Sequence, residues 1–400
     1  MKMAIIGSGA SAILSAYYFD EMGADVTLFQ RSPLGGNLAF LVDHFPEYKI
    51  NFKRSLLTAK EYFESEIIPV GKKLEEFNLT KSGDVLRVHK RFLHPDEIVP
   101  NRSRMHDLFR VVYSVNPKDS ILKQLEENPD LFKQLGEEVI NSLHHPVESF
   151  MDFDIVIMAT GLGGDPYPMG AGKNYALNEI NLKDCGYLFY EKDIFTKLNL
   201  TGKKSLIIVG EGVSQKLAFL KLKDWLFANR EHEISWVTYK EANTSCGLGW
   251  LDDEVSEVLK EVNARFEQDK VEFETKLRAW RDLEDYEKVK IPRPIEPKAK
   301  IQIHEGYDVT SVDKLLDRDS IFVTIESSDF REAAFKKSDM LTVSADGILV
   351  CRGHKEVDLV GRVILDGEPG LYRITANDPN EIQIEIENIK DDLMKYFSKA

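Results

Sequence analysis

Two glycine-rich turns carry the most informative chemistry in this chain. The first reads Gly-Ser-Gly-Ala-Ser-Ala over residues 7–12, and the second reads Gly-Glu-Gly-Val-Ser over residues 210–214. An apolar run precedes each turn and a helical pattern follows it. In that setting the glycines bring backbone N–H groups close to a pyrophosphate at the positive N-terminus of a helix. The sequence therefore predicts two dinucleotide sites, and a flavin and a nicotinamide bound there could exchange a hydride.

The first turn leads into a longer pattern. Gly7 permits the tight turn, Gly9 admits a pyrophosphate, and Ala12 is small enough for the helix to pack on its strand. A second strand over 24–29 ends at Gln30, where an acidic residue would bind ribose hydroxyls; the amide oxygen can accept such a bond more weakly. A further glycine turn follows Leu34. The predicted cofactor ligands here are Gly7, Gly9, Ala10, Ser11, Ala12, Gln30, Arg31, Gly35 and Gly36.

The second turn has a similar setting. It follows an apolar run over 205–209 and precedes a helical pattern over 216–229 and a strand over 234–239. Lys240 stands where a base would meet the 2′-phosphate of NADP, although Glu241 comes next and Lys240 is also compatible with an ordinary solvated strand end. Both NADPH and NADH therefore stay open. The predicted ligands are Gly210, Gly212, Val213, Ser214 and Lys240.

A third motif completes a recognisable set. Residues 154–161 form an apolar run that ends in Ala-Thr-Gly. With these motifs the chain resembles the flavoproteins that have two dinucleotide-binding domains, and among them the flavin-containing and amine N-hydroxylating monooxygenases. The resemblance implies an α/β fold with two Rossmann-like domains, one for FAD and one for NAD(P)H, with helical insertions. It also implies that Ala159, Thr160 and Gly161 close the flavin domain where the chain crosses to the second domain.

The C-terminal segment departs from that family. Gly370, Leu371 and Tyr372 match its pattern, but residues 375–379 replace the Gly-Asp pair whose Asp binds the ribityl chain. In the family, the next helix points its N-terminus at the isoalloxazine. Asp378 is the candidate to replace the missing Asp, displaced by a few residues.

Composition excludes several other classes of protein. The chain has 400 residues, 43% of them hydrophobic and 30% charged, and its net charge of −15 argues against a nucleic-acid partner. Three cysteines without a Cys-x-x-Cys motif argue against a dithiol disulfide reductase and suit a reducing compartment. The histidines follow no metal-ligand spacing, and no apolar run is long enough for a membrane. The first apolar stretch is broken by glycines, so we expect no secretory signal and a cytoplasmic protein.

Three segments describe the expected domain organisation. Residues 1–170 form the first part of the FAD-binding domain, with an insertion over 37–150. Residues 171–340 form the NAD(P)H-binding domain, with a helical insertion over 241–300. Residues 341–400 return to the FAD-binding domain.

Periodicity predicts the main elements within these segments. The first insertion is expected to be mostly helical, and the second to form a long amphipathic helix or helical hairpin that covers the NAD(P)H domain rather than a dimer interface. The expected helices cover 55–77, 120–143 and 382–397, and further expected strands cover 301–305, 321–325 and 347–350.

A basic stretch stands out against the acidic background, and it lies in the first insertion. One interpretation is a site for an anionic group, with Arg102 and Arg104 as speculative substrate ligands. A solvated basic face paired with nearby acidic residues is an equally good interpretation. The basic residues are Arg87, His89, Lys90, Arg91, His94, Arg102, Arg104, His106 and Arg110.

The function expected from these features is that of an FAD-dependent oxidoreductase. NAD(P)H would reduce bound FAD, which would then react with molecular oxygen or another acceptor. The favoured reaction is monooxygenation of a small molecule, for which the resemblance suggests an amine. The cofactors carry this chemistry, so no catalytic nucleophile or triad is expected. The alternatives are a flavin dehydrogenase or NAD(P)H:acceptor reductase, and a non-catalytic nucleotide-binding redox sensor. The sequence predicts neither the substrate nor the oligomeric state.

Overall fold

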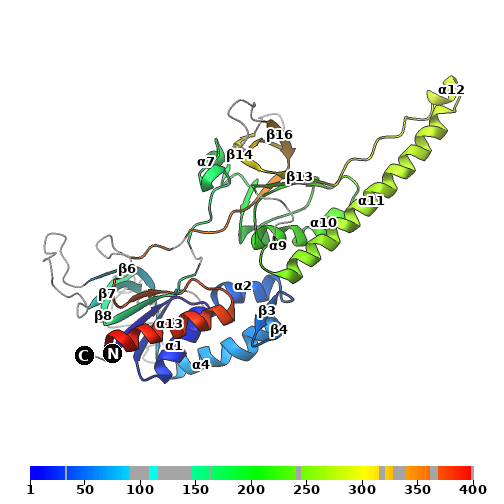
Figure 1. The fold of residues 1–400 in the computed structure, drawn as a ribbon. Coiled ribbons are helices and arrows are strands. Elements are labelled where there is room, and N and C mark those ends of the chain that lie inside the picture. The colour runs from blue at the N-terminus through cyan, green and yellow to red at the C-terminus, as the bar shows by residue number, and fades with distance from the viewer. Residues whose placement is uncertain are drawn as a thin grey trace, which may run out of the picture. The chain divides into compact units, whose positions relative to one another are not determined.

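The computed structural model describes residues 1–31, 34–90, 108–115, 146–161, 164–239, 245–314, 320–327, 339–355, 357–360 and 368–397. The chain divides into two compact units (Figure 1). Unit 1 comprises residues 1–163 and 356–400, and unit 2 comprises residues 164–355. Among the described helices, none combines the length and apolar character that crossing a membrane requires.

Unit 1 is built on a five-stranded parallel sheet in the order β18-β9-β1-β2-β5. Two of the three inner strands, β9 and β1, are almost entirely apolar and buried, as expected where both faces of a parallel sheet are covered. The strands are β1 (Lys2–Ile6), β2 (Asp25–Gln30), β5 (Thr80–Ser82), β9 (Ile155–Met158) and β18 (Leu371–Arg373).

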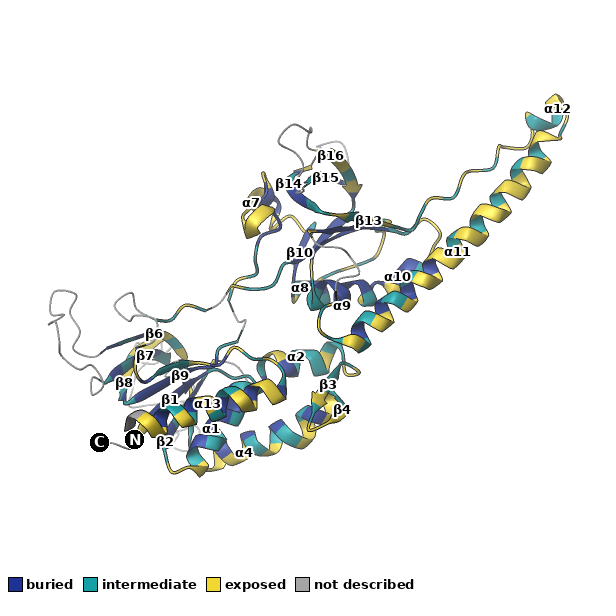
Figure 2. Ribbon diagram, viewed as in Figure 1, coloured by how far each residue is buried: buried dark blue, intermediate teal, exposed yellow. Residues whose placement is uncertain are grey.

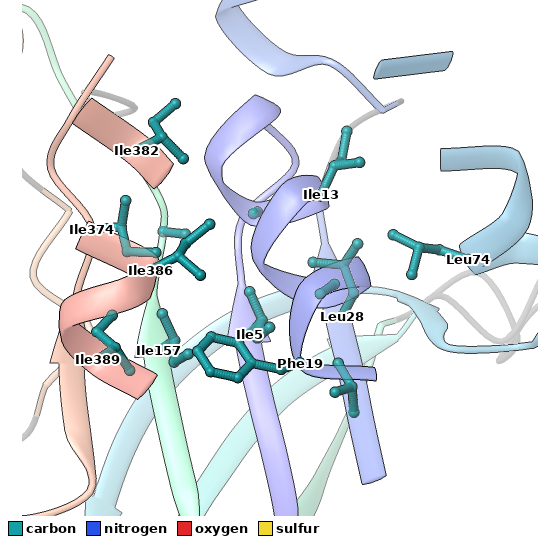
Figure 3. Packing of buried hydrophobic residues seen from close by; sticks show 14 of the residues in the cluster. Ile5, Ile13, Phe19, Leu28, Leu74, Ile157, Ile374, Ile382, Ile386 and Ile389 are labelled. Atoms are coloured by element: carbon teal, nitrogen blue, oxygen red, sulfur yellow. The ribbon is translucent and has the colours of Figure 1, made fainter. Parts of the chain in front are cut away.

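Helices of unit 1 pack on this sheet through apolar stripes. In the C-terminal helix, isoleucines spaced by three or four residues bury one face, and each buried side chain stabilises the fold by about 1.5–3 kcal/mol. Figure 3 shows the resulting core, in which the labelled residues are Ile5, Ile13, Phe19, Leu28, Leu74, Ile157, Ile374, Ile382, Ile386 and Ile389. The helices are α1 (Ala10–Glu21), α2 (Gly36–His44), α3 (Ala59–Tyr62), the π-helical η1 (Phe63–Ile67), α4 (Ile68–Glu76) and α13 (Pro379–Phe397).

The first insertion contains more β-structure than its sequence pattern suggested. Residues 55–58 form a strand of a hairpin rather than the start of a helix, and the helical run follows from Ala59. A three-stranded antiparallel sheet, β6-β7-β8, is also present, because its strands are rich in β-branched and aromatic residues. The helix expected over 120–143 lies outside the described residues. The additional strands are β3 (Lys49–Phe52), β4 (Ser55–Thr58), β6 (Asp84–Lys90), β7 (Phe109–Val115) and β8 (Val147–Phe153).

Unit 2 is built on another five-stranded parallel sheet, in the order β10-β17-β11-β12-β13. A three-stranded antiparallel sheet, β14-β15-β16, accompanies it. The strands of both sheets are β10 (Leu188–Tyr190), β11 (Ser205–Gly210), β12 (Glu233–Thr238), β13 (Ile301–Glu305), β14 (Tyr307–Lys314), β15 (Ile321–Ser327), β16 (Met340–Ala345) and β17 (Gly347–Cys351). Short helical elements complete the unit: η3 (Ala171–Lys173), α7 (Glu179–Leu182), α8 (Asp193–Thr196), α9 (Val213–Lys221) and α10 (Lys223–Ala228).

The strand expected over 347–350 belongs to unit 2, so its assignment to the returning FAD-binding domain was wrong. β17 is apolar throughout and pairs with both β10 and β11 at the centre of the second sheet. The chain therefore crosses back near residue 356 instead of residue 341. The error arose because an apolar strand carries no signal for which sheet it joins.

The second insertion forms one long helix, α11 (Gly249–Arg281), followed by α12 (Asp285–Lys288). Its buried residues are confined to the first half, where they cover part of unit 2 as expected. The second half extends beyond these buried positions, as Figure 2 shows by its mostly exposed surface. The buried residues of α11 are Leu251, Val255, Val258 and Val262.

Candidate dinucleotide-binding sites

The first glycine turn packs directly on the end of the Ala-Thr-Gly strand. A Cβ atom at Gly7 would overlap the carbonyl oxygen of Ala159 and lie 2.8 Å from its carbonyl carbon. The Ala159 N–H donates to the Ile6 carbonyl at 2.9 Å, and the Gly7 N–H donates to the Phe29 carbonyl at 2.9 Å. The close approach of these strands therefore requires glycine at position 7, whether or not a ligand is bound.

Gly9 is different, because none of the described residues requires a glycine there. Its φ is −81°, which any residue adopts, and a Cβ atom would meet no atom within 4 Å. Gly9 is the N-cap of α1, which has no side-chain cap and no acidic residue in its first turn among the described residues. The N–H groups of Ala10, Ser11 and Ala12 therefore face an open, electropositive position that suits a pyrophosphate.

The second glycine turn of unit 1 contacts the first. The Gly35 N–H donates to the Ser8 carbonyl at 2.7 Å, and a Cβ atom at Gly36 would lie 3.0 Å from the Gly9 Cα. Both Gly35 and Gly36 have positive φ, at +113° and +51°. Two segments about 25 residues apart in the sequence thus form one backbone surface around Gly9, which is the arrangement that a nucleotide's phosphates require.

Gln30 ends β2 with an unsatisfied acceptor. Its Oε1 atom is buried and has no hydrogen-bond partner among the described residues. An unsatisfied buried polar atom costs about 1–3 kcal/mol, and a hydroxyl donor of a ligand would remove that cost. Arg31 instead lies at the surface, with 81% of its side chain exposed, and pairs with Asp84 at 3.1 Å.

Asp378 caps the C-terminal helix of unit 1. Its Oδ1 atom accepts the Asn380 N–H at 2.9 Å and the Glu381 N–H at 3.4 Å. Glu385 meanwhile accepts the N–H groups of Thr375 and Ala376, at 3.0 and 3.2 Å. The segment that replaces Gly-Asp is therefore held by the chain's own carboxylates, and helix capping by itself accounts for the presence of Asp378.

The second turn repeats the construction of the first. A Cβ atom at Gly210 would overlap the carbonyl oxygen of Cys351, as one at Gly7 would overlap Ala159. Gly212 is the N-cap of α9 and has a φ of +79°. A Cβ atom at Gly212 would meet no atom of the described residues within 4 Å. The N–H groups of Val213 and Ser214 thus begin a helix at an open position, in the same way as those that follow Gly9.

The resemblance of the two turns extends to the strand beside each. β9 runs into Ala-Thr-Gly at 159–161, and β17 runs into Cys-Arg-Gly at 351–353, each ending in a glycine of positive φ. In unit 1 the residue after β18 is Ile374, whose N–H donates to the Met158 carbonyl of β9. In unit 2 the residue after β10 is Glu191, whose N–H donates to the Val350 carbonyl of β17 in the same way. Sequence reasoning missed this second strand end, although an apolar run followed by a small residue and Gly353 was visible.

Glu191 was not predicted from the sequence, yet it lies at the second turn. It is 5% exposed, has a φ of +41°, and its Oε1 atom accepts the Gly353 N–H at 2.6 Å. Burial raises the pKa of its carboxyl, while hydrogen bonds from Gly353 and Ser214 offset part of that rise. Glu191 stands out only through its burial and its contact with Gly353, which is distant in the chain. No local sequence pattern therefore marks Glu191 as part of this site.

An ion pair anchors the start of α11 to α9. Lys216, whose side chain is 5% exposed, pairs with Asp252, which also accepts the Ser245 hydroxyl at 2.7 Å and the Cys246 N–H at 3.3 Å. Burial pushes the pKa of Asp252 upward, but these donors outweigh it and lower the pKa to about 2. Lys240, the predicted phosphate ligand, lies in residues 240–244, outside the described part of the chain.

The basic stretch is described only at its ends. There Arg87 pairs with Glu148 at 3.5 Å, and Lys90 pairs with Glu368 at 3.6 Å. Arg110 makes a bidentate pair with Asp152, at 2.9 and 3.1 Å. These three residues therefore have acidic partners within unit 1. Arg102 and Arg104, with Arg91, His94 and His106, lie outside the described residues.

The described residues also bear on metal and thiol chemistry. They contain no group of three or more histidine, cysteine or acidic side chains placed to hold a metal ion. All three cysteines are free, and they lie at residues 185, 246 and 351 in unit 2.

Comparisons with known proteins identify the fold. No family profile matches the chain, and no curated protein sequence matches it. A thioredoxin reductase from Lactococcus lactis matches with a TM-score of 0.54 at 11% identity, over 100% of this chain and 99% of that chain. The bacillithiol disulfide reductase from Bacillus cereus matches with a TM-score of 0.53 at 11% identity, over 100% of both chains. The cadaverine monooxygenase DfoA from Erwinia amylovora, solved bound to FAD, matches with a TM-score of 0.52 at 9% identity, over 98% of this chain and 94% of that chain. The chain therefore has the fold of the flavoproteins with two dinucleotide-binding domains, as its sequence motifs predict.

Proposed function

We propose that this protein is an FAD-dependent oxidoreductase in which NAD(P)H reduces bound FAD. The observation that carries the proposal is the doubled turn: Gly9 and Gly212 each begin a helix at a position where a side chain would meet nothing within 4 Å. A single turn of this kind would support a nucleotide-binding protein. Two of them, on two sheets with the same strand pattern, support an exchange of electrons between two nucleotides.

FAD is assigned to the first turn because the residues present fit it. The open position at Gly9 suits the pyrophosphate, and Gly35 and Gly36 extend that backbone surface. The buried, unsatisfied Oε1 atom of Gln30 suits a ribose hydroxyl at the end of β2. Unit 1 also supplies the Ala-Thr-Gly strand that accompanies a flavin in the family that the chain resembles. Asp378 remains a candidate only, since it already caps α13.

NAD(P)H is assigned to the second turn, with Gly210, Gly212, Val213 and Ser214 around its pyrophosphate. FAD supplies the redox chemistry when bound, by accepting a hydride from the nicotinamide and passing electrons on. The chain's own residues bind and orient both nucleotides and exclude water. The choice between NADPH and NADH rests on Lys240 and stays a prediction.

Monooxygenation of a small molecule, with an amine as the suggested substrate class, is the reaction we favour. It draws on the sequence resemblance and on the similarity to the FAD-bound cadaverine monooxygenase. The two reductases of similar fold favour an NAD(P)H:acceptor reductase as the second candidate. A dithiol mechanism is disfavoured, because the three cysteines of the chain include no Cys-x-x-Cys pair. Free thiols of this kind suit a cytoplasmic location, which we include in the proposal.

Three measurements on the purified protein test this function. The proposal expects stoichiometric FAD in the absorbance spectrum after denaturation, and loss of the oxidised flavin band when NADH or NADPH is mixed in without oxygen. Monooxygenase activity would appear as oxygen consumption that an amine stimulates, whereas oxygen-independent turnover with an added acceptor would indicate a reductase. A flavin that neither NADH nor NADPH reduces would overturn the oxidoreductase and leave a nucleotide-binding sensor.

A further inference from the structure

The second turn carries a buried carboxyl group that has no counterpart at the first. In unit 1 the residue after β18 is Ile374, which is apolar and 2% exposed. In unit 2 the residue after β10 is Glu191, which occupies the corresponding place in the ladder and is 5% exposed. A dinucleotide domain folds without a carboxyl at this position, as unit 1 demonstrates, so packing alone does not account for Glu191.

The partners of Glu191 bring its carboxyl to the place where an anion would bind. Its Oε1 atom accepts the Gly353 N–H at 2.6 Å, and the Ser214 side chain is its second hydrogen-bond partner. Ser214 is the second residue of α9, directly after the Gly212 N-cap. The carboxyl is therefore bonded to the same helical turn whose N–H groups would receive the pyrophosphate.

We infer that Glu191 is a positioning residue of the second dinucleotide site, and that its carboxyl group must be neutral when a pyrophosphate is bound at the first turn of α9. The inference rests on the function proposed above and adds a proton to the binding step. A neutral carboxyl still holds Gly353 and Ser214, whereas a carboxylate would repel the negative oxygens of the pyrophosphate in a partly buried setting. The burial that raises the pKa of Glu191 in the free protein already favours that neutral form.

Other titratable groups lie in the same part of unit 2, and their effect on the pH dependence of binding has to be distinguished from that of Glu191. Cys351, at the end of β17, is fully buried, and burial raises the pKa of its thiol. Burial lowers the pKa of Lys192, and burial together with Lys192 lowers the pKa of His354. Glu211 lies in the turn itself. Protonation of His354 would also strengthen anion binding at low pH, so it needs its own variant.

The experiment measures binding of ADP-ribose to the flavin-loaded protein by calorimetry between pH 5.5 and 8.5. ADP-ribose keeps the pyrophosphate and lacks the 2′-phosphate of NADPH, which would itself titrate in this range; adenosine, which lacks the pyrophosphate, is the ligand control. The wild-type affinity is expected to fall with rising pH, approaching about tenfold per pH unit above the pKa of Glu191, because the bound state holds one more proton. Binding in buffers of different ionisation enthalpy should show uptake of that proton.

Glu191→Gln supplies the decisive comparison. Glutamine keeps the hydrogen bonds and imitates the neutral carboxyl, so the variant should bind ADP-ribose at pH 8.5 as tightly as the wild type binds at pH 5.5, with no slope. The matched control, Glu233→Gln at the opposite, amino-terminal end of β12, should keep the wild-type slope.

The outcomes separate this inference from the function that it assumes. A flat wild-type profile, an unchanged slope in Glu191→Gln, or a slope that His354→Gln removes would overturn the inference while leaving nucleotide binding intact. Should Glu191→Gln fail to fold, the uptake of a proton when the wild type binds ADP-ribose still tests the inference. Binding without proton uptake would contradict it. Failure of both ADP-ribose and NADH to bind would instead overturn the assignment of the second site.

Discussion

The two parallel sheets share the construction of their glycine turns and differ in the residue that lies beside each turn. In both units a glycine at the end of the central strand lies against a neighbouring strand end, and a helix begins three residues later. The units differ beside that turn, where unit 1 has Ile374 and unit 2 has Glu191. The shared glycines therefore follow from the close packing of neighbouring strand ends, whereas that packing does not explain the difference between Ile374 and Glu191.

The largest expected effect comes from the first glycine of either turn. Gly7→Ala and Gly210→Ala would each drive a methyl group into a backbone carbonyl of a central neighbouring strand, at Ala159 or Cys351. Backbone cannot move aside there without breaking the ladder, so we expect a loss of about 4 kcal/mol or more in the free energy of unfolding. Chemical denaturation checks this. Stable, flavin-loaded Gly7→Ala protein would contradict the shared structural role.

The next effect concerns the ion pair between α9 and α11 in unit 2. Asp252→Asn would remove the carboxylate charge that pairs with the buried Lys216 ammonium, which should cost about 3 kcal/mol. The pKa of Asp252 is lowered to about 2 in the folded protein. The Asp252 carboxylate therefore stabilises the fold fully at pH values above its ordinary pKa, and this stabilisation is lost as pH falls toward 2.

The stabilities of wild type and variant, measured from denaturation curves, should therefore differ most between pH 5 and 8, and the difference should shrink only as pH falls from about 4 toward 2. As a control, Glu267→Gln breaks an exposed pair on α11 and should cost no more than about 0.5 kcal/mol. Equal effects of the two substitutions would show that the Lys216 pair is no more than a surface contact.

Substitutions at Gly9 and Gly212, the second glycine of each turn, distinguish the loss of a ligand from the cost of backbone strain. Gly9→Val has both space and an ordinary φ, so the protein should fold normally and lose FAD, which absorbance after denaturation would measure. Gly212→Val has the same space but a φ of +79°, which costs about 1–3 kcal/mol in a residue other than glycine. It should abolish flavin reduction by NAD(P)H and also lower stability. Stoichiometric FAD in Gly9→Val would show that the first site is misassigned.

The parts of the fold that were predictable from sequence are those that local pattern encodes. The turns at Gly7 and Gly210, the strand before Ala159 and the helix α11 follow from glycine spacing and apolar periodicity, and the structure contains all four. The sheet β6-β7-β8 was not predicted, because charged residues interrupt the apolar alternation of its strands, although β-branched and aromatic residues on them favour β-structure.

The remaining errors concern long-range pairing. Nothing local in Gly347–Cys351 says that it joins β10 and β11, so its domain could not be read from sequence. The contacts of Glu191 with Gly353 and Ser214 also join segments that are distant in the chain. Glu191 is followed by the charged residues Lys192 and Asp193, yet the fold buries its side chain.

The smallest expected effect tests the contrast between Glu191 and Ile374 without any ligand. Because burial raises the pKa of Glu191, its contribution to stability is fully present below its ordinary pKa and is lost as pH rises through the raised value. Glu191→Gln is neutral at every pH and should therefore melt at a higher temperature than the wild type at pH 8, with the difference shrinking toward pH 5. Each kcal/mol corresponds to about 2–4 °C in a unit of this size, so a shift of a few degrees is measurable by calorimetry. A difference that stays constant between pH 5 and 8 would mean that the carboxyl is ionised throughout, and the contrast with Ile374 would then be one of packing rather than of charge.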